Sequence, residues 1–248
     1  MNNSIPSVAP GPLRTWSVED ALELYGVRYW GRDHFDINLD GHLVVGIDNQ
    51  TVDLKLLVDD LSRRGISLPV LIRFSDLLKA RIALINRAFQ AAIDEYGYKG
   101  EYRGVYPIKV NQSRKVVEAI TRHGRDYHFG LEAGSKPELL AAMALLDDAK
   151  ALVVCNGYKD AHYVETALLA SKLRHVVLIV VEKPSELELI REVSENLGIR
   201  PAIGIRLKLA ARGSGRWEKS AGDKAKFGLT ASELIRAVDQ LKQWDMLD

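Results

Sequence analysis

Strand-like apolar runs alternate with helical stretches along most of this sequence, and no other feature limits the possible folds as strongly. The apolar runs recur after roughly 25 residues, at 105–110, 128–131, 151–155, 175–181 and 202–209. Helical patterns follow them at 115–122, 137–146, 161–172, 186–196 and 232–244. Strands and helices that alternate at this spacing predict right-handed crossovers and a parallel sheet.

Two α/β architectures contain such a sheet, an open doubly wound sheet and a (β/α)8 barrel of the TIM type. Periodicity alone does not separate them. The sequence shows about five βα units, which would complete an open sheet but only part of a barrel. Capping boxes that begin at Ser135, Ser185 and Thr230 predict where three of the helices start.

The N-terminal part of the chain has a different pattern. Residues 1–15 are rich in proline and small polar residues, which predicts a disordered tail. Residues 16–76 predict a small β-containing lead-in, with a helix from Ser17 to Tyr25 and a hairpin between 35–38 and 42–45. Residues 77–248 form the predicted sheet domain, which begins with a long amphipathic helix over 77–96.

The composition favours a globular protein that binds a small molecule. The chain of 248 residues has 34 Lys or Arg and 33 Asp or Glu, so its net charge favours neither nucleic acid nor an anionic membrane surface. No stretch approaches the 18 or so uncharged apolar residues of a membrane-spanning helix. Cys155 is the only cysteine, which excludes an intramolecular disulfide and predicts a reducing, cytoplasmic location.

Polar residues end each of the predicted strands. Ligands bind at the carboxyl ends of the strands in both architectures, so these residues are the candidates for a functional site. In strand order they are Lys109 and Asn111, then Glu132, then Cys155 and Asn156, then Glu182 and Lys183, and finally Arg206 and Lys208.

Lys109 is the unusual member of this group because it interrupts an apolar run. Burial lowers the pKa of a lysine amine, and a neutral amine is the nucleophile that forms an imine with an aldehyde. The pattern therefore favours Schiff-base chemistry at Lys109. The alternative is a lysine that reaches solvent or pairs with Glu132. Pro107 cannot donate to a sheet, which predicts a local distortion beside Lys109.

Glu132 and Arg206 are the candidate partners of Lys109. A carboxylate and a guanidinium at one edge of a sheet can orient the lysine and a substrate or cofactor oxygen, or can form a structural ion pair. The glycine-rich segment 211–216 carries two arginines and is followed by Lys219, Lys224 and Lys226, and we interpret it as a mobile lid that can receive an anion.

Other classes of site find no support in the sequence. The six histidines lack metal-ligand spacing, and there is no Gly-x-Ser-x-Gly motif. The sequence therefore predicts neither a zinc site nor a hydrolase, and it names no metal ligand.

Four ordered blocks of residues resemble the biosynthetic arginine decarboxylases. They are YPIKVNQ at 106–112, GLEAGSKPEL at 130–139, VCNGYKD at 154–160 and VEKPSEL at 181–187. Similarity also appears at 16–48, 203–209 and 226–229, so the resemblance covers nearly the whole chain after the tail. Blocks of this length in this order are highly specific.

The resemblance implies a pyridoxal-phosphate enzyme on an alanine-racemase-like barrel, which converts L-arginine to agmatine and carbon dioxide for polyamine and spermidine synthesis. Magnesium is also associated with the family. By the same resemblance, Lys109 matches the lysine that holds the cofactor as a Schiff base, while Glu132 and Arg206 match polar residues near the cofactor. The implied partners are L-arginine and, in full-length members, further copies of the chain; nucleic acid and membranes are not among them.

Members of the family are far longer than this chain, so the resemblance predicts the amino-terminal part of such an enzyme, with residues 77–248 as an incomplete barrel. The cofactor-stacking histidine, the glycine-rich phosphate loop, the carboxylate at the pyridine nitrogen and the guanidinium-binding residues are not expected within it. Two alternatives stay open, a decarboxylase of another basic amino acid and a non-enzymatic barrel protein that binds pyridoxal phosphate.

Overall fold

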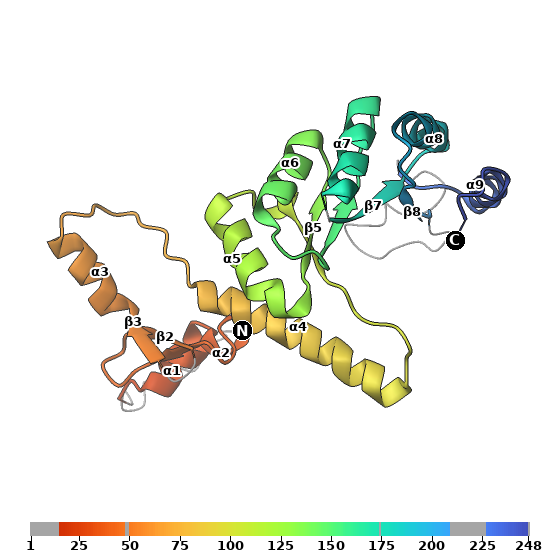
Figure 1. Cartoon of the computed structure of the whole chain (residues 1–248). Coiled ribbons are helices and arrows are strands. Elements are labelled where there is room, and N and C mark those ends of the chain that lie inside the picture. Colours follow the sequence, from red (N-terminus) through yellow and green to blue (C-terminus); the bar gives the residue numbers. More distant parts are fainter. Residues whose placement is uncertain (1–14, 48–49, 174, 209–226, 248) are drawn as a thin grey trace, which may run out of the picture. The chain divides into compact units, whose positions relative to one another are not determined.

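The chain divides into two compact units, Met1–Leu77 (unit 1) and Leu78–Asp248 (unit 2). This computed structural model describes residues 15–47, 50–173, 175–208 and 227–247 (Figure 1). Unit 1 contains an antiparallel sheet and unit 2 a parallel one. Among the described residues, no helix has both the length and the apolar character needed to cross a membrane.

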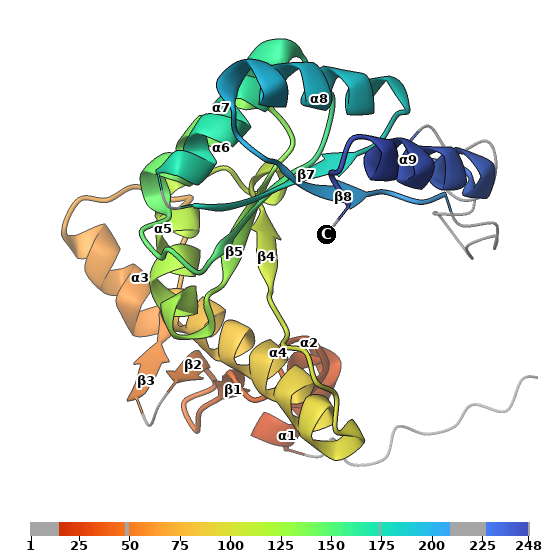
Figure 2. The ribbon, with the colours of Figure 1, turned by 45° about the vertical axis from the view of Figure 1, so that its right-hand side comes forward.

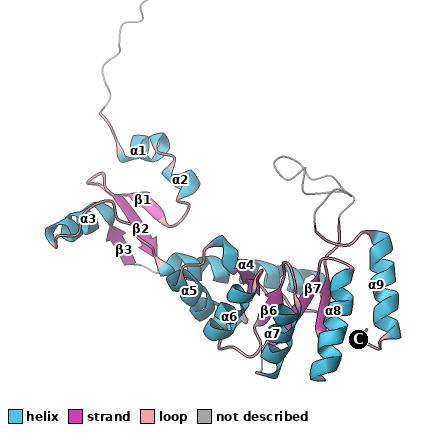
Figure 3. Cartoon of the chain, turned by 90° about the horizontal axis from the view of Figure 1, so that it is seen from above, coloured by secondary structure: helices cyan, strands magenta, loops and turns pink. Residues whose placement is uncertain are grey.

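Unit 1 is built on a three-stranded sheet in the order β1-β2-β3 (Figure 3). Its elements are α1 (Val18–Leu24), α2 (Val27–Trp30), β1 (Phe35–Ile37), β2 (Leu43–Ile47), β3 (Gln50–Asp53) and α3 (Leu54–Arg63). Helix α1 begins at a capping box between Ser17 and Asp20, and β1 pairs with β2 in a hairpin. The predicted first helix and hairpin are therefore confirmed.

Strand β3 and helix α3 were missed by the sequence prediction. Strand β3 is mostly exposed, so it lacks the alternation of apolar and polar residues that signals a half-buried strand. The start of helix α3 could have been predicted, because aspartate is a common N-cap residue. The Asp53 carboxylate caps this helix and accepts a hydrogen bond from Leu56 N at 3.0 Å.

The sheet of unit 2 has five parallel strands in the order β4-β5-β6-β7-β8, which is also their order along the chain. They are β4 (Val105–Pro107), β5 (Gly130–Ala133), β6 (Leu152–Cys155), β7 (Val176–Val181) and β8 (Ala202–Ile205). A doubly wound sheet reverses its strand order at a switch point, whereas a βα barrel keeps the sequential order. The strand order therefore identifies the sheet as part of a TIM-type barrel. Periodicity alone had left this choice open.

The helices of the parallel-sheet region lie where the sequence predicts them, the first before β4 and the others each after one strand. They are α4 (Ser75–Tyr96), α5 (Arg114–Gly124), α6 (Lys136–Leu145), α7 (Ala161–Lys172), α8 (Ser185–Leu197) and α9 (Ala231–Gln243). Figures 1 and 2 show α5, α6, α7 and α8 side by side along one face of the parallel sheet. The predicted bounds of α7 match the observed ones, and the others differ by a few residues at most.

The core of unit 2 lies between the sheet and these helices. Alternate strand residues such as Val153, Cys155 and Ile179 are buried, while their neighbours Val154 and Val180 are only half-buried. A strand places successive side chains on opposite faces, so one face of the sheet carries the core. The opposite face corresponds to the interior of a closed barrel, which packed side chains fill.

Four local predictions differ from the structure. At Ser135 the side chain caps α6, but Glu138 accepts from Gly134 N and not from Ser135 N, so the predicted capping box is only half formed. The first strand ends at Pro107, and Ile108–Val110 form a short 3-10 helix (η1), since proline cannot continue the ladder. Helix α8 begins at Ser185 with Pro184 as its N-cap and without a side-chain cap, so that predicted capping box is wrong. The last strand ends at Ile205, followed by an isolated bridge between Leu207 and Leu229. The predicted lid at 211–216 lies outside the described residues.

Candidate active site

The carboxyl ends of the five parallel strands bring together the polar residues that the sequence places there. In strand order these are Lys109, Glu132, Asn156, Glu182 and Arg206, and we call this group the rim. Lys109 and Asn156 both contact the Glu132 carboxylate. Arg206 and Glu182 form a separate ion pair. Barrel enzymes place their active sites at this end of the sheet.

Lys109 lies on η1 just after β4, and its side chain is 62% exposed. The expectation of a buried lysine is therefore wrong for this chain. The reason is local: the turn after Pro107 buries Ile108 and turns the next side chain outward. Lys109 Nζ donates to Glu132 Oε1 at 3.4 Å, which is the ion pair that the sequence left as an alternative.

Glu132 is the most enclosed carboxylate near Lys109, with a side chain only 6% exposed on a fully buried strand. Its Oε1 accepts from Lys109 Nζ and from Asn156 Nδ2, the latter at 3.2 Å. Its Oε2 is buried and has no hydrogen-bond partner in the described part of the chain. Buried polar atoms in folded proteins are nearly always paired, so Oε2 is suited to a donor from a bound molecule.

Arg206 lies at the same edge but belongs to a separate pair. Its Nη1 donates to Glu182 Oε1 at 2.8 Å, and Glu182 is 4% exposed while Arg206 is 51% exposed. The guanidinium also lies over the Phe227 ring, 5.7 Å from its centre. The sequence placed Arg206 at the rim but did not name Glu182 as its partner. The guanidinium is half-exposed and only its Nη1 is shown to contact Glu182, so its other N–H donors can bind an anionic group.

Two buried side chains beneath the rim fix the strand ends. The Tyr163 hydroxyl lies 2.8 Å from the carbonyl oxygen of Ala133 and 3.2 Å from that of Asn156. Burial raises the pKa of the Cys155 thiol to about 11, and burial likewise raises the pKa of Tyr163. Both groups are therefore neutral near pH 7, and neither is suited to act there as a base.

Helix starts next to the rim are fastened by two glutamates that the sequence prediction did not single out for this role. Glu138 Oε2 accepts from Gly134 N at 2.7 Å, and Glu186 Oε2 accepts from Glu182 N at 2.8 Å. Each glutamate lies four residues after the residue whose backbone N–H it accepts from. The same spacing occurs in two of the four blocks that resemble the family, and it could have predicted these contacts. Both contacts stabilise the segments that carry Glu132 and Glu182.

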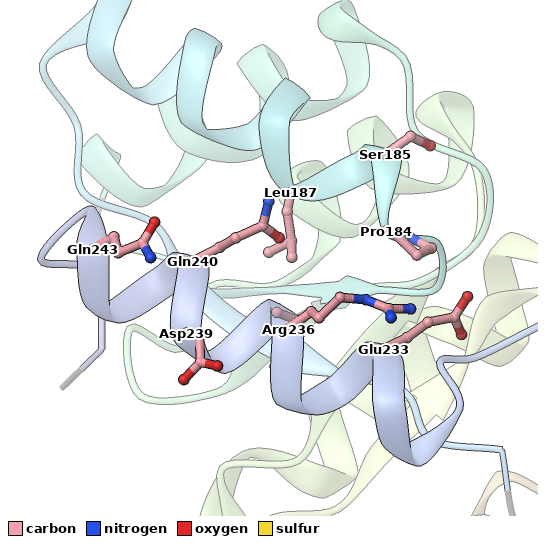
Figure 4. Close-up of a pocket in the computed structure, with 9 residues that line it drawn as sticks. Pro184, Ser185, Leu187, Glu233, Arg236, Asp239, Gln240 and Gln243 are labelled. Atoms are coloured by element: carbon pink, nitrogen blue, oxygen red, sulfur yellow. The ribbon is translucent and has the colours of Figure 1, made fainter.

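A pocket of about 440 Å³ lies between α8 and α9 (Figure 4). Pro184, Leu187, Arg236 and Gln240 are among the residues that line it. The pocket contains no rim residue, so we place the candidate site at the rim, where the polar groups converge. Within the described ranges, no three His, Cys, Asp or Glu side chains gather in a way that could hold a metal ion.

Comparison with known proteins gives a consistent result. Residues 82–248 match the family model of the pyridoxal-dependent decarboxylases, pyridoxal binding domain. The chain is 53% identical over 238 residues to the biosynthetic arginine decarboxylase of Gloeobacter violaceus, covering 95% of this chain and 37% of that protein. The corresponding protein of Phocaeicola vulgatus is 52% identical, with 95% and 38% covered. This chain thus spans under two-fifths of the length of these curated relatives.

Solved structures support the same fold. The biosynthetic arginine decarboxylase SpeA from Campylobacter jejuni matches with a TM-score of 0.79 at 35% identity, over 90% of this chain and 36% of that one. Diaminopimelate decarboxylase from M. jannaschi matches with a TM-score of 0.66 at 22% identity, over 87% of this chain and 46% of that one, and shows likeness of fold alone.

Proposed function

This chain belongs to the pyridoxal-dependent decarboxylases, and we propose that it forms the cofactor-binding part of an enzyme that converts L-arginine to agmatine and carbon dioxide. The observation that carries the proposal is the exposed amine of Lys109 at the rim, 3.4 Å from a buried carboxylate with one unused oxygen. Arginine is supported as the substrate by relatives that are 52–53% identical in sequence and are named biosynthetic arginine decarboxylases.

The residues at the rim fit the chemistry of pyridoxal phosphate. When bound, this cofactor supplies an aldehyde for attachment to an amine and a ring that accepts the electron pair left by carbon dioxide. Lys109 Nζ is the amine within this group that has an exposed side chain to reach such an aldehyde. Glu132 Oε2 can accept a hydrogen bond from a donor on the bound molecule, and Arg206 can bind an anionic group.

The chain's own residues would act mainly by position. Glu132 holds the end of the Lys109 side chain from one side, and Asn156 in turn holds the Glu132 carboxylate, so the amine stays at the rim. Lys109 is exposed, so its Nζ would be able to reach the amine of an incoming substrate and to accept or give up a proton there. Fixed geometry of this kind contributes to catalysis by orienting the reacting groups.

Release of labelled carbon dioxide tests the proposal. The chain is incubated with pyridoxal phosphate and carboxyl-labelled L-arginine, with L-lysine and L-ornithine in parallel and a Lys109→Ala variant as control. We expect release from arginine in preference to the other two, and loss of release in the variant. Faster release from lysine or ornithine would contradict the substrate assignment. Cofactor binding without release from any substrate would show that the reaction needs the parts of the site that are expected outside this chain.

A further inference from the structure

Lys159 is buried in the loop between β6 and α7, with its side chain 0% exposed. Its Nζ donates to the carbonyl oxygen of Gly157 at 2.7 Å and to Glu186 Oε2 at 3.4 Å. A buried ammonium needs such partners, because the loss of hydration is otherwise uncompensated. Lys159 thus joins the segment after β6 to the start of α8.

The same Glu186 oxygen continues the connection towards the rim. Oε2 of Glu186 accepts from Glu182 N at 2.8 Å, while the Glu182 side chain holds Arg206. Glu182 O in turn accepts from Gly228 N at 3.1 Å. Lys159 is therefore linked to Arg206 through two glutamates: Glu186 holds the backbone N–H of Glu182, and the side chain of Glu182 holds the guanidinium.

On its other side, Lys159 holds a tightly packed glycine loop. Gly157 has a φ of +80°, and a Cβ at that position would lie 2.2 Å from Gly134 O, so the two loops touch through their backbones. Asn156, immediately before Gly157, donates its side-chain amide to the Glu132 carboxylate. Its backbone N–H donates to the carbonyl oxygen of Ala133 on the neighbouring strand. Lys159 therefore contacts a loop that also carries the Asn156 contact to Glu132.

We propose that Lys159 is a positioning residue for the cofactor site, which fixes Glu132 through Asn156 and Arg206 through Glu186 and Glu182. The inference rests on the proposed function, because it assigns a role in placing the residues that would contact the cofactor. Lys159 itself is shielded from that site and takes no part in the chemistry.

The energetics of buried ion pairs favour a role in geometry over one in stability. Desolvation of two charges offsets much of their attraction, and well-packed apolar residues are often equally stable in such places. Here the cost is greater, because Glu186 Oε1 is buried without a hydrogen-bond partner among the described residues. The ion pair between Lys159 and Glu186 fixes the distance between the segment after β6 and the start of α8. Residues that support a binding site in this way determine how precisely its side chains are placed.

The test separates position from stability with two variants. Lys159→Met removes the ammonium at nearly constant volume but leaves the Glu186 carboxylate buried without its cation. The double variant Lys159→Met with Glu186→Gln also removes that charge while an amide oxygen stays in place for Glu182 N. Affinity for pyridoxal phosphate is measured by absorbance titration of the whole chain, and thermal unfolding is followed in the same samples.

We expect the double variant to regain most of the thermal stability lost in Lys159→Met. It should nevertheless bind pyridoxal phosphate about tenfold more weakly than the unmodified chain, which is the lower end of the effect of removing residues that support metal ligands. Lys136→Met is the matched control, because it removes an exposed ion pair to Asp160 beside the same loop. We expect the control to bind the cofactor as the unmodified chain does.

Two results would overturn the proposal. If the double variant regains unmodified cofactor affinity along with stability, Lys159 contributes to folding alone. If the unmodified chain itself fails to bind pyridoxal phosphate, the proposed function fails and this inference fails with it. The two failures are distinguishable, since only the second is seen in the unmodified chain.

Discussion

The two units use burial differently, although each is organised around a sheet. In unit 1, the buried apolar residues of the described chain are Leu22, Val27, Val44 and Val45. Large side chains such as Tyr25, Tyr29 and Trp30 remain exposed there. Unit 2 has a large core that runs from Ile108 to Leu241, and a second, smaller cluster formed by Ile82, Val116 and Ile120.

This difference teaches where a precise site can form. The rim residues of unit 2 lie at the ends of one sheet, whose strands β5, β6 and β7 carry buried residues of the core, so the core helps to fix their positions. The polar cluster of unit 1, in which His42 and Asn38 contact Asp53, is part-buried and lies on a sheet with little core behind it. We therefore place function in unit 2.

The largest expected effect comes from truncating one leucine in each core. Leu139 is 0% exposed and belongs to the main core, whereas Leu22 is 5% exposed in unit 1. We expect Leu139→Ala to lower the free energy of unfolding of unit 2 by about 4 kcal/mol and Leu22→Ala to lower that of unit 1 by about 2 kcal/mol. Hydrogen exchange measured separately for the two units would check this, and equal losses would break the comparison.

Next in size is the effect of adding a methyl group to one glycine in each unit. Gly157 and Gly41 both have positive φ, at +80° and +78°, but only Gly157 is crowded by a neighbouring backbone. We expect Gly157→Ala to cost roughly 3 kcal/mol of stability, from strain and overpacking together. Gly41→Ala should cost only about 1 kcal/mol.

Urea denaturation of both glycine variants measures this difference. It would also show whether the loop contact between Gly157 and Gly134 is as tight as the structure places it. A Gly157→Ala chain no less stable than Gly41→Ala would contradict that contact.

Helix caps should have effects of similar size in the two units, because capping is local. Ser17 and Thr230 each form a capping box, with Asp20 and Glu233 respectively. Replacement of either Ser17 or Thr230 by alanine should cost about 1 kcal/mol. Circular dichroism during thermal unfolding measures both variants, and a loss several times larger in one of them would show that the cap also supports tertiary packing.

The smallest effects concern acid pH. A hydrogen bond from Leu56 N, with help from His42 and Asn38, lowers the pKa of Asp53 below its usual 3.8. For Asp148, partial burial acts in the opposite direction, but hydrogen bonds from His128 and Lys150 N still lower the pKa. Each ionised carboxylate therefore contributes stability above pH 3.8, which is lost as the pH falls through the lower folded-state value.

Asparagine variants at these two positions test the sign. Asp53→Asn and Asp148→Asn should each be less stable than the unmodified chain at pH 6, and the difference should shrink as the pH falls below 3.8. Urea denaturation over a series of pH values measures this. A difference that grew towards acid pH would contradict the assigned direction.

Local patterns predicted most of the fold. Alternation of strands and helices, with a capping box such as that at Thr230, located the elements of unit 2 within a few residues. The choice between an open sheet and a barrel needed the strand order, which is a tertiary property. Strand β3 escaped because it is short and mostly exposed, so no apolar pattern marks it.

The site was predictable by position, and one of its two ion pairs, Lys109 with Glu132, was among the alternatives that the sequence offered. Parallel strands end at one edge, so Lys109, Glu132 and Arg206 could be placed together from their positions at strand ends. The pairing of Arg206 with Glu182 joins residues 24 positions apart, and nothing in the local sequence selects it. The burial of Lys159 could not be predicted either, because a lysine in a loop normally reaches solvent.

Reductive labelling tests the central claim, that Lys109 is the residue that binds the cofactor, most directly. The chain is mixed with pyridoxal phosphate, reduced with borohydride to fix the attached group, digested and examined by mass spectrometry. We predict one major labelled peptide, with the label on Lys109, since its amine is exposed at the rim. A label on Lys183 or Lys159 in its place, or no labelled lysine at all, would contradict the assignment.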